Sequence, residues 1–174
     1  MTDKSNSPKA KEHSIETEGK TVYYTQATID KWDQKLLNLN ENNRAFIKYS
    51  LEDADDILKL LGSEKNLLNY TAKDLDELVF LWNNKKISFN HINEEQFVGA
   101  IGAAFGHYLN MEVGTAWEIV SDEYGTDYSC ISKTIVFQLF PFSSVWKALE
   151  QNREDSLNGI VLLVKEKMDS WDKR

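Results

Sequence analysis

The chain has 174 residues, of which 20 are Lys or Arg and 28 are Asp or Glu, so its formal net charge is −8. This length allows one domain with a sizeable core, and an apolar content of 41% excludes an intrinsically disordered chain. The acidic balance argues against a general nucleic-acid-binding protein, whose phosphate contacts need clustered Lys and Arg.

The N-terminal residues are polar and have almost nothing to bury, so we expect a disordered tail over residues 1–22. Residues 23–174 are expected to form a single domain that begins with a helical part, residues 26–111. Within it, Ile29, Trp32 and Leu36 have the spacing of one helix face. This spacing predicts a first helix over residues 28–37.

Two helix-start signals follow. Ser50 stands three residues before Asp53, a capping-box pattern that predicts a helix over residues 50–61. Thr71 and Asp74 repeat the pattern and predict the next helix.

Beyond residue 93 the pattern changes from helical to extended. Asn93 precedes two acids and predicts the start of a helix that ends near residue 110. Alternation around Trp117 predicts a strand, and residues 134–140 predict a second one, so a hairpin is expected over residues 115–140. Helices are expected again over residues 142–172. The sequence therefore predicts a mostly helical α+β domain with its helices packed on a small antiparallel sheet or hairpin.

A group of residues between positions 97 and 150 carries a family resemblance. It consists of Gly102 and Gly106 on an apolar helix, Trp117 in a strand, the run Asp122-Glu123-Tyr124-Gly125, the step Phe140-Pro141, and Lys147. With these residues the segment resembles the bacterial family filed as domain of unknown function 3806. The resemblance implies a bacterial protein without an assigned activity, and it supplies no catalytic residue.

The turn at residues 122–125 is the strongest candidate for a binding site. Its two acids and the phenol of Tyr124 could bind a cation or a basic side chain, or supply a general base. Adjacent residues of a strand point to opposite faces, so Asp122 and Glu123 are not a matched pair of carboxylates. The alternative is a structural turn in which Gly125 adopts a positive φ and Tyr124 packs over the hairpin.

A small-ligand or enzyme site would lie between the helix at 96–110 and this turn, and His107 and Trp117 would line it together with Glu123 and Tyr124. Glycines in that helix cost helix stability, so they indicate either close packing of the helix or the floor of a ligand groove. His107 is either a ligand or a partly buried residue that forms hydrogen bonds.

The common zinc-binding motifs are missing from the sequence. It contains no HExxH, no CxxC and no pair of His four residues apart, so we expect no metal and no cofactor. Cys130 has no His near it in sequence and is expected to be an unreactive thiol. With a single Cys, no apolar segment in the first 20 residues and no long apolar run, we expect a cytoplasmic protein that does not enter the membrane.

The charge is unevenly distributed, because residues 21–130 contain 18 acidic and 9 basic residues. Asp53, Asp55 and Asp56 belong to this acidic part and are candidates for contact with a basic protein. The leading hypothesis is a non-catalytic protein-binding module, with an immunity-type protein that neutralises a basic toxin as its sharpest form. The alternative is a small-ligand binder or an enzyme with the site described above.

Overall fold

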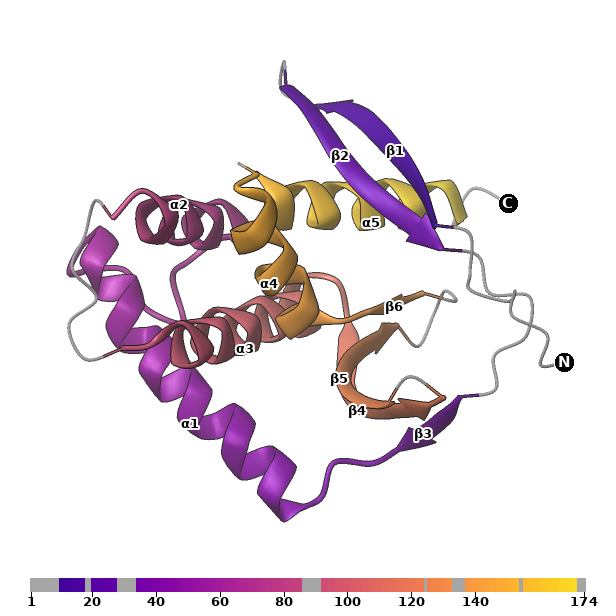
Figure 1. The fold of residues 1–174 in the computed structure, drawn as a ribbon, viewed down its shortest axis with the longest axis horizontal. Helices are drawn as coiled ribbons and strands as arrows, with labels where there is room; N and C mark the ends of the chain where they lie inside the picture. The colour runs from indigo at the N-terminus through magenta and orange to yellow at the C-terminus, as the bar shows by residue number, and fades with distance from the viewer. Residues whose placement is uncertain are drawn as a thin grey trace, which may run out of the picture.

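The computed structural model describes residues 10–17, 20–27, 34–85, 92–123, 125–132, 137–153 and 155–171. The elements in chain order are β1 (Ala10–Thr17), β2 (Lys20–Ala27), β3 (Lys35–Leu37), α1 (Glu41–Leu58), α2 (Ala72–Asn83), α3 (Glu94–Glu112), β4 (Thr115–Asp122), β5 (Gly125–Ser132), β6 (Gln138–Leu139), α4 (Pro141–Gln151) and α5 (Ser156–Trp171) (Figure 1). A short 3₁₀ helix, Lys59–Leu61, extends α1. The predicted α+β class, with helices packed on a small antiparallel sheet, is confirmed.

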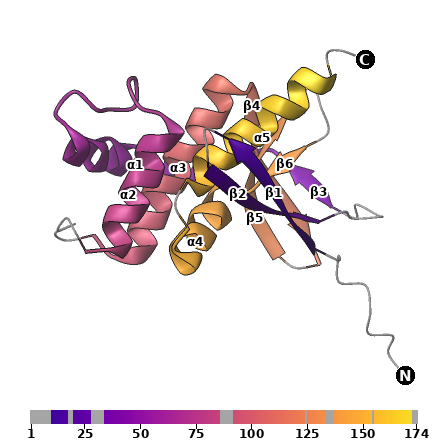
Figure 2. The ribbon, with the colours of Figure 1, turned by 90° about the horizontal axis from the view of Figure 1, so that it is seen from above.

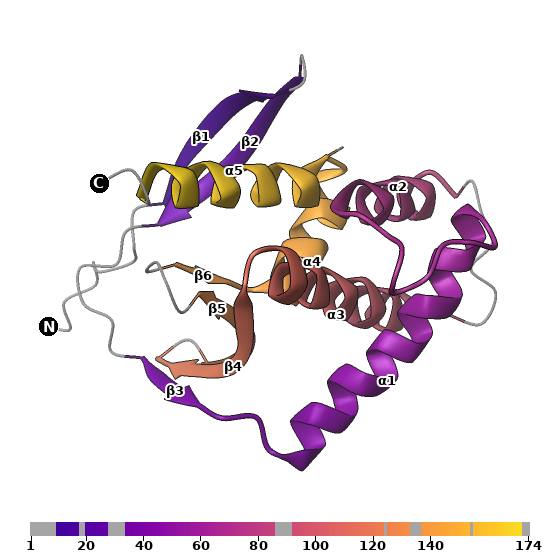
Figure 3. The same cartoon turned by 180° about the vertical axis from the view of Figure 1, so that it is seen from behind.

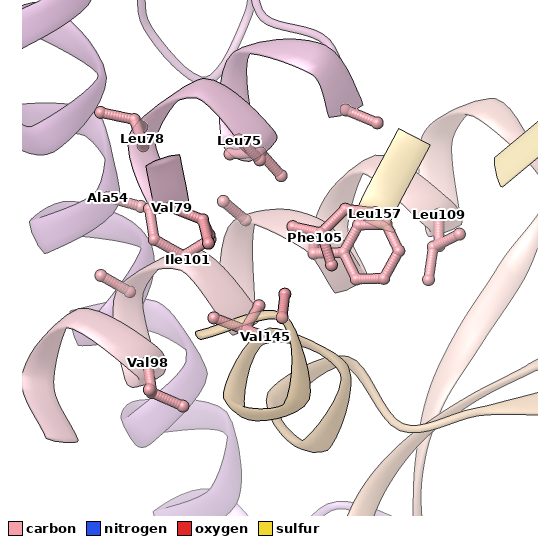
Figure 4. Packing of buried hydrophobic residues seen from close by; sticks show 14 of the residues in the cluster. Ala54, Leu75, Leu78, Val79, Val98, Ile101, Phe105, Leu109, Val145 and Leu157 are labelled. Atoms are coloured by element: carbon pink, nitrogen blue, oxygen red, sulfur yellow. The ribbon is translucent and has the colours of Figure 1, made fainter. Parts of the chain in front are cut away.

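Helix α3 lies at the centre of the helical part, in contact with α1, α2 and α4 and with strands β4 and β5. Its long apolar face is fully buried at Phe97, Ile101, Phe105 and Leu109. Figure 4 shows these layers meeting: side chains from α1, α2 and α4 and from the start of α5 surround α3. Burial of this continuous apolar surface is the main force that holds the helices together.

Two of the predicted helix starts are confirmed by reciprocal capping. Thr71 caps α2 by accepting a hydrogen bond from the N–H of Asp74, whose carboxylate accepts one from the N–H of Thr71. Asn93 and Gln96 form the same arrangement at the start of α3. Each box satisfies N–H groups that the first turn of a helix cannot satisfy itself.

The four-stranded sheet has the order β3-β4-β5-β6 with antiparallel pairing throughout. Figure 2 shows it beside the helical layer, with the β1–β2 hairpin near α5. Strands β4 and β5 pair over their full length, from Thr115 opposite Ser132 to Asp122 opposite Gly125. The predicted turn is therefore confirmed, and Gly125 has the expected positive φ of 135°.

Four sequence predictions of local structure are wrong in part. Residues 35–37 form a strand instead of the end of a helix, and the predicted helix residues 28–33 lie outside the described part. The helix predicted over 50–61 begins nine residues earlier, because Asn40 and Asn43 form its capping box. The strand that follows the turn covers 125–132, and of residues 134–140 only 138–139 are a described strand. Residues 10–17 and 20–22, expected in the tail, and residues 23–27, expected at the start of the domain, form the paired strands β1 and β2.

A long-range cap connects α2 to α5. Asp76 of α2 is buried, and its two carboxylate oxygens accept hydrogen bonds from the backbone N–H groups of Leu157 (2.9 Å) and Asn158 (2.8 Å). These N–H groups belong to the first turn of α5, where a negative charge also suits the helix dipole.

Among the described residues, no helix has the length and apolar character needed to cross a membrane.

Candidate functional site

An open groove of about 890 Å³ lies between α1 and the corner at which α3 leads into β4. Figure 3 shows α1 running diagonally beside α3, with its N-terminal end leading from β3, next to β4. The groove is lined by Asn38 and Leu39 before α1, by Arg44, Ile47, Lys48, Leu51, Glu52, Asp55 and Asp56 of α1, by Leu67, and by Asn110, Thr115, Ala116 and Trp117 at the corner. The volume falls in the range of 300–1,000 Å³ that is common for ligand pockets.

The α1 wall of the groove has a charge order. Arg44 and Lys48 lie toward the N-terminal end of the helix, and Glu52, Asp55 and Asp56 lie toward its C-terminal end. Ile47 and Leu51 lie among them and face the groove with Leu39, Leu67 and Ala116. The groove thus combines apolar side chains with a rim that changes from basic to acidic along α1.

Trp117 lines the groove and is held in a defined position. Its ring covers Gly106 of α3 so closely that a Cβ at residue 106 would lie 2.0 Å from Cζ2 of the indole. On another side the ring stacks on Phe142 of α4, with centroids 5.7 Å apart. With its carbonyl oxygen turned toward the indole, the Asn110 amide accepts a hydrogen bond from Trp117 Nε1 at 3.2 Å and donates to Thr115.

The same close approach occurs at Gly102, where a Cβ would lie 2.4 Å from Cδ1 of Phe142. Gly102 and Gly106 therefore serve close packing against α4 and β4, the first of the two interpretations of this pattern. The alternative, a ligand-binding floor at these glycines, is wrong because Trp117 and Phe142 fill the space.

Asp55 forms internal contacts at the acidic end of the groove. Its carboxylate accepts a hydrogen bond from the N–H of Leu67 (3.0 Å) and pairs with Lys59 (3.0 Å). The hydrogen bond from Leu67 and the contact with Lys59 lower the pKa of Asp55, so it is ionised at neutral pH. Asp56 also pairs with Lys59, but its side chain is 82% exposed, and Asp53 is exposed on α1 without lining the groove. Asp55 thus anchors the loop that follows α1, while Asp56 remains open to a partner.

The other predicted binding residues lie away from the groove. Asp122 is at the far end of β4, where it accepts a hydrogen bond from Gln34 Nε2 at 3.2 Å. Glu123 is exposed in the turn, and Tyr124 lies outside the described residues. His107 is half-buried on α3, with its ring edge-on to Tyr70. Of the four predicted binding residues that the structure describes, Trp117 alone lines the groove.

Burial favours the neutral forms of two titratable residues in the core. Cys130 is fully buried, and burial raises the pKa of its thiol to about 12 although a contact with Thr115 partly opposes this. Burial lowers the pKa of His107, which is therefore mainly neutral at pH 7. In the part of the chain that the structure describes, no three His, Cys, Asp or Glu side chains gather into a site that could hold a metal ion.

Comparison with known proteins agrees with the resemblance seen in the sequence. The family described as Domain of unknown function (DUF3806) matches residues 74–160, half of the chain. The chain belongs to this family. The matched segment runs from the first turn of α2 into α5, so it contains α3, the β4–β5 hairpin and α4.

Among solved structures, the chain is similar to a protein from Bacteroides thetaiotaomicron VPI-5482 whose crystal structure has a resolution of 1.50 Å. The TM-score is 0.53 with 14% sequence identity, over 87% of this chain and 69% of the other. At this identity the likeness concerns the fold alone. None of the curated proteins compared with the chain matches it.

Sequence reasoning found Asp55 and Asp56 of the α1 wall as candidate contact residues but missed Arg44, Lys48 and Leu51. With a helix expected to begin at Ser50, the first two of these residues fell outside it. The signal that could have found them is Asn40 with Asn43, an amide version of the capping box that usually pairs Ser or Thr with Glu or Gln. The α3–β4 corner belongs to the segment that matches the family, whereas α1 lies outside it. One side of the groove is therefore formed by the matched segment and the other by residues that precede it.

Proposed function

We propose that this protein is a non-catalytic module that binds a segment of another protein in the groove between α1 and the α3–β4 corner. The observation that carries the proposal is the groove itself, with apolar side chains between charged groups of both signs. Peptide-binding grooves commonly use apolar contacts for affinity and a charged rim for register and choice of partner. His107 and Cys130, the most chemically versatile of the described side chains, do not line it.

We also propose one narrower form of this function and one alternative to it. An immunity-type protein that neutralises a basic toxin would use the acidic end of α1, and the excess of acidic residues over residues 21–130 supports this form. A small-ligand binder is the second candidate, which the groove volume of about 890 Å³ favours. Both readings place the ligand in the same groove.

The proposal is tested by blocking the groove without disturbing the core. Ala116 lines the groove and is partly exposed, so the side chain introduced by Ala116→Lys is expected to occupy it. Leu60→Lys adds the same charge beyond α1, at an exposed residue that does not line the groove. Tagged wild-type protein and both variants are expressed at equal levels in the native host, and captured proteins are quantified by mass spectrometry.

We expect a stoichiometric protein partner that is lost with Ala116→Lys and kept with Leu60→Lys, while circular dichroism shows both variants folded. Equal capture by all three proteins would overturn the proposed site. Loss of a copurified small molecule without a protein partner would instead favour the small-ligand reading. If Ala116→Lys does not fold, Lys48→Glu at the exposed rim serves as the second variant.

A further inference from the structure

We propose that the partner segment carries an order of charges opposite to that of α1, with acidic residues placed against Arg44 and Lys48, basic residues against Glu52 and Asp56, and apolar residues between them. This inference rests on the proposed function and deepens it, because it names the chemistry of the segment that the groove accepts. The occupant is an extended stretch of a second protein that lies along α1.

The order of charges along the groove wall is the reverse of the order that stabilises a helix. A helix is stabilised by negative side chains near its N-terminus and positive ones near its C-terminus. In α1, Arg44 completes the first turn and Asp55 and Asp56 lie in the last turn, which has no basic residue. Glu41 in the first turn follows the usual preference, but it does not line the groove. The unfavourable order is therefore found on the side of α1 that faces the groove.

Internal contacts leave charge available at both ends of the wall. The Arg44 guanidinium forms no hydrogen bond or ion pair with the described part of the chain. Lys48 and Glu52 are 3.7 Å apart, but both side chains are mostly exposed, and exposed pairs of this kind contribute little. At the acidic end, Lys59 is the one cation of the described residues that pairs with both Asp55 and Asp56. Within the described residues, Arg44 is thus open to a carboxylate, and the acidic end retains net negative charge.

The helix dipole and the side chains reinforce each other along the groove. The N-terminal end of α1 is positive because of its unpaired N–H groups, and the C-terminal end is negative because of its unpaired carbonyl groups. Arg44 and Asp56 are twelve positions apart, which corresponds to about 18 Å along the helix axis. An extended peptide covers this distance with about five or six residues. A partner with the complementary order gains at both ends, and one with the reversed order meets like charges at both.

The test uses a random 12-residue peptide library displayed on phage and selected against the full chain. Selected peptides are then synthesised, each with a version in which the acidic and basic ends are exchanged, and their affinities are measured by fluorescence anisotropy. The protein is also prepared as the double variant Arg44→Glu with Asp56→Lys. Asp53→Lys is the matched control for the Asp56→Lys half of this variant, because it makes the same charge change on α1 at an exposed residue that does not line the groove.

We expect the selected peptides to carry acidic and basic ends about five or six residues apart, and the exchange of those ends to weaken binding to wild type about fivefold or more. The double variant should prefer the exchanged peptides, whereas Asp53→Lys should keep the wild-type preference. Peptides whose binding is blocked by Ala116→Lys but that show no charge order would overturn the inference and leave the proposed function standing. A selection that yields no peptide sensitive to Ala116→Lys would count against both.

Discussion

The close contact between α3 and Trp117 predicts that replacing glycine by alanine has opposite effects on stability at two positions of α3. Gly106→Ala would place its Cβ 2.0 Å from Cζ2 and 2.2 Å from Cη2 of Trp117. An ordinary carbon–carbon contact is about 3.5 Å, so the indole must move by about 1.5 Å. The ring cannot do so freely, because it stacks on Phe142 and is hydrogen-bonded to Asn110.

The expected magnitude follows from these contacts. Alanine favours a helix over glycine by about 1 kcal/mol. Overpacking costs about 1–3 kcal/mol, and disturbing the aromatic stack and the indole hydrogen bond costs about 1–2 kcal/mol more. Gly106→Ala should therefore destabilise the protein by about 1–4 kcal/mol. At about 2–4 °C per kcal/mol for a chain of this size, the Tm should fall by roughly 2–16 °C.

Gly99→Ala is the matched control. Among the described residues, its added Cβ would meet only Ser50 Oγ, at 3.7 Å, which is an ordinary contact. The helix preference of alanine is then unopposed, and the Tm should rise by roughly 2–4 °C. Differential scanning calorimetry of wild type and both variants measures the two shifts. A Gly106→Ala protein as stable as Gly99→Ala would refute the reasoning, since the indole would then be free to move.

Four further predictions concern other parts of the molecule. Asp76→Ala should lower the free energy of unfolding by about 1–3 kcal/mol in urea titrations, because two N–H groups of α5 lose their acceptor; an unchanged value would contradict the cap. Arg44→Glu should raise that free energy by about 0.3–1 kcal/mol, since a carboxylate suits the N-terminal end of α1 and can pair with Lys48, and a loss of stability would argue against the dipole account. Cys130 should not react with Ellman's reagent at pH 8 until the protein unfolds, and rapid labelling of the native protein would contradict its burial. Because burial lowers the pKa of His107, the unfolded chain takes up that proton first, and stability should fall as the pH drops below about 6.5; His107→Gln should weaken this dependence, as measured by unfolding between pH 7 and 5.

Sequence reasoning succeeded where local chemistry decides the structure. The caps of α2 and α3 use side chains that act within three residues of each other, so their pattern is visible in the sequence. The turn at 122–125 was likewise visible, because Gly125 can adopt the positive φ that the turn needs. The α+β class followed from such local features, and the family resemblance rests on short motifs such as the run at 122–125 and the step Phe140-Pro141.

Long-range pairing could not be read from the sequence in the same way. Leu36 fits a helical stripe, yet the hydrogen bonds of β4 make it part of a strand. Ser50 resembles a helix cap but faces α3 near Gly99 in the middle of α1. The groove depends on contacts between residues even farther apart in the sequence. The sequence analysis assigns Trp117 to one site and Asp55 and Asp56 to another. Packing of α1 and β4 on α3 brings all three residues to one groove.

The central claim, that the groove binds a segment of another protein, is tested most directly by photo-crosslinking in the native host. A benzophenone amino acid is placed at residue 116 in the groove and, in a second protein, at residue 53 on α1 outside the groove lining. The account predicts that residue 116 crosslinks to one segment of one partner protein and that residue 53 does not. Crosslinking of the same partner segment from residue 53 alone would contradict it.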